Sequence, residues 1–429
     1  MPASFMDPLN DDILDEIISY IEPQKVFPFM MSCKNFYAAA LPRLLSELRL
    51  SYSSWGTRRL YKYCDFMLAK PSDRIPHLKK LTILNNCFHS GSTASLAIVI
   101  RQATHLQSLS IQMSTGSLAS YPGLVHALRA LPDLQYLNLS LDLPSAYEVL
   151  PRMTSHPREI VLSHFDNPYK PDELLQSCVN SLQVLRISGL SVFRTGSLVW
   201  PLVHTLEVGC LVDISQLSHA FPAVRRLVLS LGATPSWSDE LDIAWMDLDH
   251  IHYDSSLVAL FPCNVRRLDL CNWGSYPHVV SYVQRCSPIV LSCMVTDIGE
   301  CFAQIAQAAS HVQFLSIRGS FQHSRNRLFE KDLAEHMHLL GGLSLFGLSL
   351  VGATNASTPS RALDSVYQEL AKQVAANIPS LEYIIIGGRR YRCTFHARSR
   401  AEGNLPEVEQ LSESLGHVIE RQLLDRGRS

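Results

Sequence analysis

Two histidines between residues 247 and 254 have the side chains and the spacing that a metal site could use. His250 and His252 lie two residues apart in the sequence DLDHIHYD, so on a β-strand their side chains point to the same side. Two imidazoles can share a zinc ion, but a zinc site takes at least one further protein ligand. No third ligand stands at a fixed spacing from this pair. We therefore predict no metal site and expect both histidines to be solvated strand residues.

Other residues that could support catalysis lack the necessary patterns. The sequence has no G-x-S-x-G nucleophile motif, no P-loop and no H-E-x-x-H motif. His336 and His338 belong to a stretch of helical character, where residues two apart do not share a face. The cysteines between 286 and 301 do not have zinc-ligand spacing. The arginine-rich run 389–400 could contact nucleic acid or anionic lipid, but its shortness favours a solvated segment. We predict no catalytic residue and no cofactor.

The composition favours a folded protein outside the secretory pathway. The 429 residues are 47% hydrophobic with a formal charge of −2, which is typical of globular proteins. Without a basic excess we expect no binding to nucleic acid. The first residues lack the basic and apolar regions of a secretory signal, and the longest aliphatic run, 96–100, is too short to cross a membrane. We therefore expect reduced cysteines, no membrane association, and a cytoplasmic or nuclear location.

The motif L-x-x-L-x-[L/I/V] recurs along nearly the whole chain and must position any site. Clear copies start at Leu78, Leu106, Leu134, Leu182, Val203, Val224, Val265, Val312, Leu345 and Leu381, and weaker copies start at Pro157, Leu248 and Cys286. The last two apolar positions are two residues apart, as a strand with one buried face requires. Units of this length cannot bury an apolar face alone and must stack. The sequence predicts an irregular solenoid of roughly 11 to 13 repeats.

Helical periodicity separates many of these expected strands. Leu96, Val99, Ile100 and Ala103 follow the i, i+3, i+4, i+7 rule. Asp172 is expected to be the N-cap of a helix over 173–179, because its carboxylate can accept from first-turn amides. A strand, a crossover helix and a parallel strand wind right-handedly. We therefore predict an α/β fold, a right-handed strand–helix solenoid with a parallel sheet on its concave face.

The two ends of the chain do not follow the repeat. We expect a helical module over 1–45, a joint over 46–77 that caps the first repeat, and the solenoid over 78–388. A basic segment and a capping helix, opened by Pro406, are expected over 389–429. Apolar residues at helical spacing mark the first helix of the module, with a second cluster over 26–31. These residues of the first helix are Ile13, Leu14, Ile17, Ile18 and Ile21.

The N-terminal module resembles the F-box, whose pattern is roughly L-P-x-E-I-L-x-x-I, an apolar second helix, and a V/S-C-[KR]-x-[WF] stretch. The matching residues are Leu9, Asp12, Ile13, Leu14, Ile17, Tyr20, Ile21, Val26, Phe27, Ser32, Cys33, Lys34 and Phe36. Asn10 replaces the usual proline, and Pro28 falls inside the second helix. Such a module directly before leucine-rich repeats resembles the F-box/leucine-rich-repeat proteins.

This resemblance implies the substrate-recognition subunit of a cullin-RING (SCF-type) ubiquitin ligase, which needs no catalytic residue of its own. The apolar residues expected to bind a Skp-type adaptor are Leu9, Ile13, Leu14, Ile17, Val26, Phe27 and Met30. The alternative for this stripe is an ordinary amphipathic helix packed on the first repeat.

The repeats are expected to hold the protein to be ubiquitylated on their concave face. Motif positions three and five flank the buried fourth residue and point to that face. The candidate substrate-binding residues at these positions are Tyr136, Arg186, Glu207, Arg226, His250, His252, Arg267, Asp269 and Phe314. The alternative is that these are solvated strand residues without a partner. For the whole protein, the rival functions are a repeat scaffold or inhibitor that acts without a ligase and, less favoured, a hydrolase with an unrecognised site.

Overall fold

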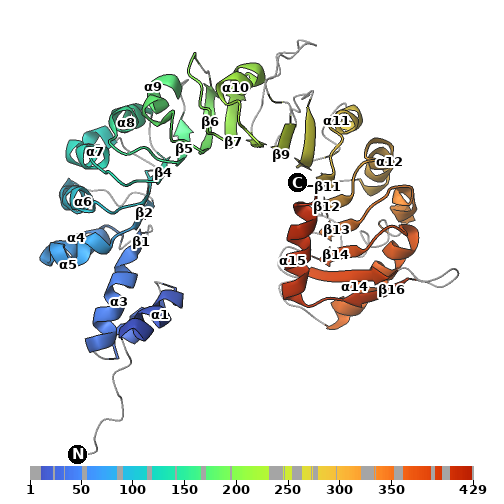
Figure 1. The fold of residues 1–429 in the computed structure, drawn as a ribbon, viewed down its shortest axis with the longest axis horizontal. Coiled ribbons are helices and arrows are strands. Elements are labelled where there is room, and N and C mark those ends of the chain that lie inside the picture. The colour runs from blue at the N-terminus through green and yellow to red at the C-terminus, as the bar shows by residue number, and fades with distance from the viewer. Residues whose placement is uncertain are drawn as a thin grey trace, which may run out of the picture. The chain divides into compact units, whose positions relative to one another are not determined.

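The chain folds into two compact units of mixed α/β structure, residues 1–203 and residues 204–429, drawn in Figure 1. The structure is a computed structural model. It describes residues 11–22, 25–32, 34–50, 56–84, 90–113, 118–140, 143–165, 171–193, 196–230, 245, 247–253, 263–271, 273, 279–295, 297–319, 333, 335–351, 361–387, 392–398 and 406–427.

The first unit begins with three helices that pack on one another. They are α1 (Asp11–Tyr20), α2 (Phe27–Met30) and α3 (Lys34–Ser46). Their shared core contains Ile18, Val26, Met30 and Ala40. The apolar spacing in the sequence therefore correctly predicts a helical module, and Pro28 is accommodated because it lies in the first turn of a short helix, where a missing amide costs little.

A parallel sheet follows in the first unit, and its strands pair in chain order. The strands are β1 (Glu47–Leu50), β2 (Lys80–Leu84), β3 (Ser108–Gln112), β4 (Tyr136–Ser140), β5 (Glu159–Phe165) and β6 (Val184–Phe193). The helices between them are α4 (Gly56–Ala69), α5 (Pro71–Arg74), α6 (Ser90–Gln102), α7 (Pro122–Arg129), α8 (Leu143–Val149) and α9 (Pro171–Leu175). Short 3-10 turns cover 75–77, 118–120, 150–152 and 176–178.

The second unit repeats this arrangement with a longer sheet. Its parallel strands are β7 (Thr205–Val212), β8 (Arg226–Leu229), β9 (Asp247–Tyr253), β10 (Asn264–Leu270), β11 (Val290–Val295), β12 (Phe314–Gly319), β13 (Gly347–Val351) and β14 (Tyr383–Gly387). Two antiparallel strands follow, β15 (Arg392–Arg398) and β16 (Glu407–Gln410). The helices are α10 (Ile214–Ala220), α11 (Val279–Cys286), α12 (Ile298–Ala308), α14 (Arg361–Asn377) and α15 (Glu413–Leu424), with a 3-10 turn over 337–340.

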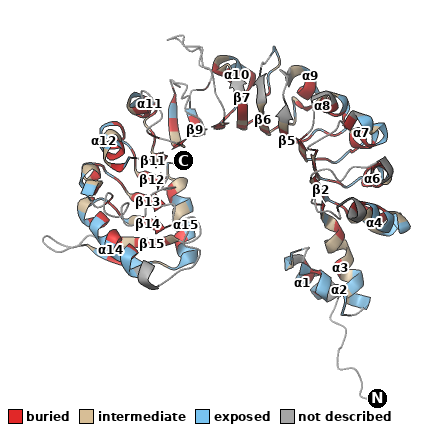
Figure 2. Cartoon of the chain, turned by 180° about the vertical axis from the view of Figure 1, so that it is seen from behind, coloured by how far each residue is buried: buried red, intermediate tan, exposed pale blue. Residues whose placement is uncertain are grey.

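Each copy of the leucine motif, the weaker ones included, lies at one of the strands β2 to β14. In β3, for example, Leu109 and Ile111 are fully buried and Leu106 precedes them in the core. The buried residues of the strands and the buried sides of the intervening helices form the core of each unit (Figure 2). The α/β class and the long parallel sheet are therefore confirmed, and the arrangement is compatible with a solenoid.

The ends of the sheet differ from the sequence-based expectation. Glu47–Leu50, expected to belong to a joint, pairs with β2 as an additional parallel strand. Arg392–Arg398, expected to be a solvated basic segment, pairs with β14. The helix expected to start at Pro406 starts only at Glu413, because residues 407–410 extend the sheet as β16.

Asp172 is not the N-cap that the sequence suggests. It lies inside the short helix α9, which begins at Pro171. Its carboxylate instead accepts hydrogen bonds from the backbone amides of Gly196 and Leu198, at 3.1 and 3.3 Å. Asp172 therefore ties one repeat to the following connection rather than capping its own helix.

Candidate functional site

The candidate site is the face of each sheet that carries motif positions three and five, which we call the strand face. Motif positions four and six point to the opposite face, where they pack with the helices between the strands. The strand pairing aligns the strand-face residues into rows that run across neighbouring strands. Every sequence-predicted substrate-binding residue belongs to one of these rows.

In the first unit the strand face is mainly polar, and none of the residues in its two rows is buried. One row contains Glu47, Lys80, Ser108, Tyr136, Glu159 and Val184, and the next contains Arg49, Thr82, Ser110, Asn138, Val161 and Arg186. Tyr136 and Arg186 are half-buried. The guanidinium of Arg186 lies 2.7 Å from the carboxylate of Glu159, so part of its charge is already matched within the protein.

In the second unit the two rows change character along the sheet. The first row contains Thr205, Arg226, His250, Arg267, Val290, Phe314, Gly347 and Tyr383. The second row contains Glu207, Val228, His252, Asp269, Ser292, Ser316, Ser349 and Ile385. The first row is polar from β7 to β10 and becomes apolar or small from β11 onward.

Helix α15 covers the apolar part of this strand face. Leu423 of α15 is 3% exposed and packs against Val290, Phe314 and Ile385. Phe314 is 1% exposed, so its prediction as an accessible substrate-binding residue is wrong. The expected terminal capping helix thus lies on the strand face instead of only closing the end of the sheet.

Glycines allow α15 to approach this closely. A Cβ atom at Gly347 would stand 3.0 Å from Leu423 Cδ1 and 2.9 Å from Phe314 Cδ2. On α15 itself, a Cβ atom at Gly416 would stand 2.6 Å from Oγ1 of Thr394 in β15. All three distances are shorter than ordinary van der Waals contacts, so a larger residue at either position would force a neighbouring side chain to shift.

Polar groups hold the end of α15 in place. Arg266 of β10 donates from Nη1 to the carbonyl oxygens of Leu424 and Arg426, at 2.7 and 3.0 Å. A helix end has carbonyls without an intrahelical partner, so a guanidinium there is stabilising. Arg426 in turn donates to Gln313 at 2.7 Å and stacks 3.5 Å above the ring of Phe346. These polar contacts and the apolar packing together hold α15 against the strand face.

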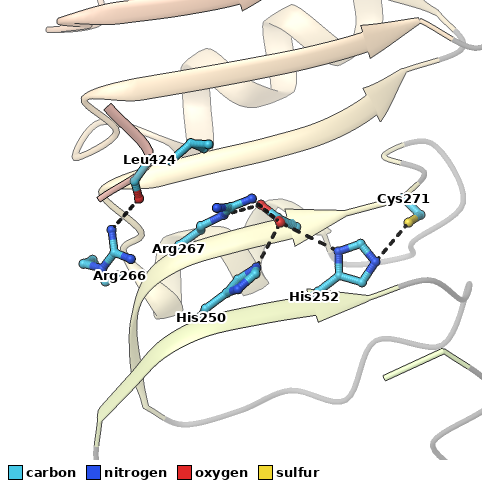
Figure 3. A network of polar contacts seen from close by, with 7 residues as sticks. His250, His252, Arg266, Arg267, Cys271 and Leu424 are labelled. Carbon is cyan, nitrogen blue, oxygen red and sulfur yellow. Dashed lines mark hydrogen bonds and ion pairs between the residues drawn. The ribbon is translucent and has the colours of Figure 1, made fainter. Parts of the chain in front are cut away.

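Next to the apolar part covered by α15, the polar residues of the rows form a connected cluster around Asp269. Figure 3 labels His250, His252 and Arg267 of this cluster. Arg267 donates two hydrogen bonds to the Asp269 carboxylate, at 3.0 and 2.7 Å. His250 Nε2 lies 2.9 Å from Asp269 Oδ2, and His252 Nδ1 lies 3.7 Å from the same oxygen. Asp269 is the acidic neighbour of the histidine pair that sequence spacing did not identify, because it stands on the adjacent strand.

Burial and charge set the protonation of this cluster. Burial raises the pKa of the Asp269 carboxyl, but hydrogen bonds from His250, His252 and Arg267 outweigh it and hold that pKa well below its usual range. Burial is also the largest influence on His250 and lowers its pKa, although the bond to Asp269 opposes this. At neutral pH the cluster therefore contains an ionised Asp269, a charged Arg267 and a neutral His250. His250 and Asp269 are buried, so they support the neighbouring surface residues and offer little surface of their own to a partner.

The geometry of this cluster does not suit a metal ion. His252 faces Asp269 with Nδ1 and the thiol of Cys271 with Nε2, so one ion cannot be bound by all three groups. Over the described ranges, no group of three or more histidine, cysteine or acidic side chains could hold a metal ion.

The strand-face residues that stay accessible are fewer than the sequence predicts. Arg226 is exposed, while Glu207, His252 and Arg267 are half-buried. Together with Tyr136 and Arg186 of the first unit, these are the predicted substrate-binding residues that are not buried.

The residues predicted to bind an adaptor divide into two groups. Leu14, Val26 and Met30 are buried, and the latter two belong to the core of the helical module, so they support the surface and do not form it. Ile13 and Ile17 on α1 are 47% and 43% exposed, and Phe27 on α2 is also exposed. Leu9 lies outside the described residues.

Two exposed apolar residues near this group were not among the predicted adaptor-binding residues. Tyr20 lies three residues after Ile17 and seven after Ile13 on the same face of α1, and Met31 lies four residues after Phe27. Their helical spacing is the signal that could have identified them.

Comparison with known proteins gives no family for this chain. Neither a scan against models of protein families nor a search of curated proteins finds a match. Among the described residues, no helix is both long enough and apolar enough to cross a membrane.

Proposed function

We propose that this protein is the substrate-recognition subunit of a cullin-RING ubiquitin ligase. Its N-terminal helices act as an F-box that binds a Skp-type adaptor, and its right-handed leucine-rich-repeat solenoid binds the protein to be ubiquitylated. The ligase acts by proximity, since the receptor raises the concentration of a substrate lysine near the conjugating enzyme. The chain itself contributes binding surfaces and no chemistry to the transfer.

The observation that carries the proposal is the exposed apolar face of the N-terminal helices. The module has its own core of Ile18, Val26, Met30 and Ala40, yet it leaves Ile13 and Ile17 exposed on one face of α1. Water-exposed isoleucines at this spacing are typical of a helix that buries that face against a partner. The alternative of an ordinary helix packed on the first repeat does not account for their exposure.

The strand faces support the second half of the proposal. Repeat sheets often bind proteins through such a face, and Arg and Tyr are frequent residues of strong contacts. In the first unit Tyr136 and Arg186 lie on the two rows, and in the second unit Arg226 is exposed. Because α15 covers the strands from β11 onward, we place recognition in the second unit on β7 to β10.

Adaptor binding is tested with the full-length chain and a purified Skp-type adaptor. In the double variant Ile13→Asp/Ile17→Asp, two apolar contacts are replaced by charges, and we expect adaptor affinity to fall at least about 30-fold, since each such contact contributes about 1 kcal/mol or more. The matched control is Val199→Asp/Leu202→Asp, which changes two apolar residues of similar exposure outside the module. Wild-type affinity in the first variant, or equal losses in both, would refute adaptor docking by α1.

Substrate capture is tested separately by affinity purification and mass spectrometry. Arg226→Glu in the second unit and Tyr136→Ala in the first should each deplete bound proteins while adaptor recovery stays constant. If the protein is a scaffold that acts without a ligase, captured proteins should be retained and no adaptor should be recovered in any sample. Capture that is unchanged in both variants would remove the strand faces from the proposal.

A further inference from the structure

Cys271 differs from the other cysteines that the structure describes. Of the eight cysteines whose side chains the structure describes, seven are buried and Cys271 is half-buried. Burial raises the pKa of the Cys64 and Cys286 thiols to about 12 and that of Cys263 to about 11. Since the thiolate is the nucleophile, these buried thiols are inert at neutral pH. Among these eight cysteines Cys271 alone is partly exposed.

The thiol of Cys271 faces a histidine that is itself oriented by a carboxylate. Cys271 directly follows β10, two residues after Asp269, and its Sγ lies 3.8 Å from Nε2 of His252 in β9 (Figure 3). The other ring nitrogen of His252 lies 3.7 Å from Asp269 Oδ2. An ionised Asp269 favours the tautomer with the proton on Nδ1, which leaves Nε2 free to accept the thiol proton.

Charged groups on the neighbouring strands lie close to this pair. Asp269 on β10 lies by the ring nitrogen of His252 that faces away from the thiol, and Arg267 donates two hydrogen bonds to Asp269. Arg226 on β8 pairs in the sheet with His250 on β9, which is neutral, and Ser292 on β11, opposite Asp269, carries no charge. A cysteine that contacts a histidine near basic side chains has the features of a reactive thiol.

We propose that Cys271 is a thiol-exchange site that forms mixed disulfides with small disulfides, with His252 as its proton acceptor and Asp269 as the positioning residue. Nε2 of His252 removes the thiol proton, and the Cys271 thiolate attacks one sulfur of the small disulfide. Its S–S bond breaks as the new S–S bond forms, and the departing thiolate takes the proton from His252. Cys271 is thereby oxidised, and one half of the small disulfide leaves as a reduced thiol.

The product places a new group on the strand face of the second unit. It stands beside His252 and two residues from Asp269, next to the residues proposed to meet a protein partner. Thiol exchange would therefore alter the surface of β9 and β10 reversibly. The exchange is independent of adaptor docking, so the ligase proposal and this one can fail separately.

The test measures the pH dependence of exchange at Cys271 in the reduced full-length chain. Bis(2-hydroxyethyl) disulfide is the probe because it has no titratable group, and the peptide containing Cys271 is followed by mass spectrometry between pH 5.5 and 9.5. We expect the inflection of the wild type to lie below about 8.5, the value of an unperturbed thiol. In His252→Gln the inflection should move up to about 8.5, so that the exchange rate at pH 6 falls several-fold.

The control is His417→Gln, an exposed histidine on α15, which should leave the wild-type profile unchanged. A wild-type inflection at or above about 8.5 would overturn the proposal without any variant. So would identical profiles in the wild type and His252→Gln, or a Cys271 that fails to exchange at any pH. Circular dichroism of each variant shows that the comparison is made between folded chains.

Discussion

The packing of Leu423 predicts how much the contact between α15 and the strand face contributes to the free energy of unfolding. Leu423 is 3% exposed and packs against Val290, Phe314 and Ile385. Replacing a buried leucine with alanine costs about 2–5 kcal/mol, as transfer free energy and a residual cavity combine. We expect Leu423→Ala to lower the free energy of unfolding of the second unit by that amount. The matched control, Leu415→Ala on the same helix, is 45% exposed and should change it by no more than about 0.5 kcal/mol.

Hydrogen exchange distinguishes release of α15 from a general loss of stability. If α15 can detach locally, a loss of 2 kcal/mol raises the detached population roughly 30-fold. Amide protection in α15 should then fall by that factor in Leu423→Ala, and protection in the strands β7 to β9 should fall less. Urea unfolding of the full chain measures the accompanying change in overall stability.

A substitution at Gly347 on β13 tests the contact with Leu423 from the side of the sheet. In Gly347→Ala the new methyl group would stand 3.0 Å from Leu423 Cδ1, and overpacking of this kind costs about 1–3 kcal/mol. Because Leu423→Ala removes the atom that is crowded, the double variant should lose less stability than the sum of the two single losses. Strictly additive losses, or equal effects of Leu423→Ala and Leu415→Ala, would contradict the docking of α15 on the strand face.

Two further predictions concern buried polar groups of the second unit. The pKa of His250 is lowered in the folded chain, so below its unfolded value of about 6.5 the unfolded chain takes up a proton that the folded chain does not, and stability should fall as the pH decreases from 7.5 to 5. His250→Gln should flatten this slope in urea titrations, whereas the same slope in both proteins would show that another group titrates. Trp245 donates its indole proton to the carbonyl of Phe221 at 2.8 Å in a buried position. Trp245→Phe should cost about 1–3 kcal/mol in the same assay, and a change below about 0.5 kcal/mol would mean that the carbonyl finds another donor.

The strands of the parallel sheet could be predicted because their signal is local. Leu106, Leu109 and Ile111 show why, since three apolar residues within six positions are enough to define one buried strand face. The same pattern occurs at β1 in Leu45, Leu48 and Leu50. It directly follows a helix there, and residues from 46 onward were expected to be a joint and not a strand. Strand β15 also alternates, with Cys393, Phe395 and Ala397 buried, although the arginines suggested a solvated segment.

The exposure of the candidate site could not be predicted in the same way, because it depends on residues far along the chain. Phe314 is covered by Leu423, which lies more than a hundred positions away. His250 is buried and contacts Asp269 on the next strand, and that contact depends on the register between β9 and β10. Alternation along a strand indicates which face a side chain points to. It does not indicate whether another element lies on that face.

The residue types along the first row of the second unit nevertheless indicate which strands α15 covers. From β8 to β10 this row contains Arg226, His250 and Arg267, while from β11 to β13 it contains Val290, Phe314 and Gly347. A valine, a phenylalanine and a glycine in adjacent positions make this part of the strand face apolar, and an apolar patch of this kind is typical of a covered surface. The amphipathic stripe at the end of the sequence supplies the covering helix. The change from charged to apolar residues therefore marks where the covered part of the face begins, and it restricts partner binding in the second unit to the strands before β11.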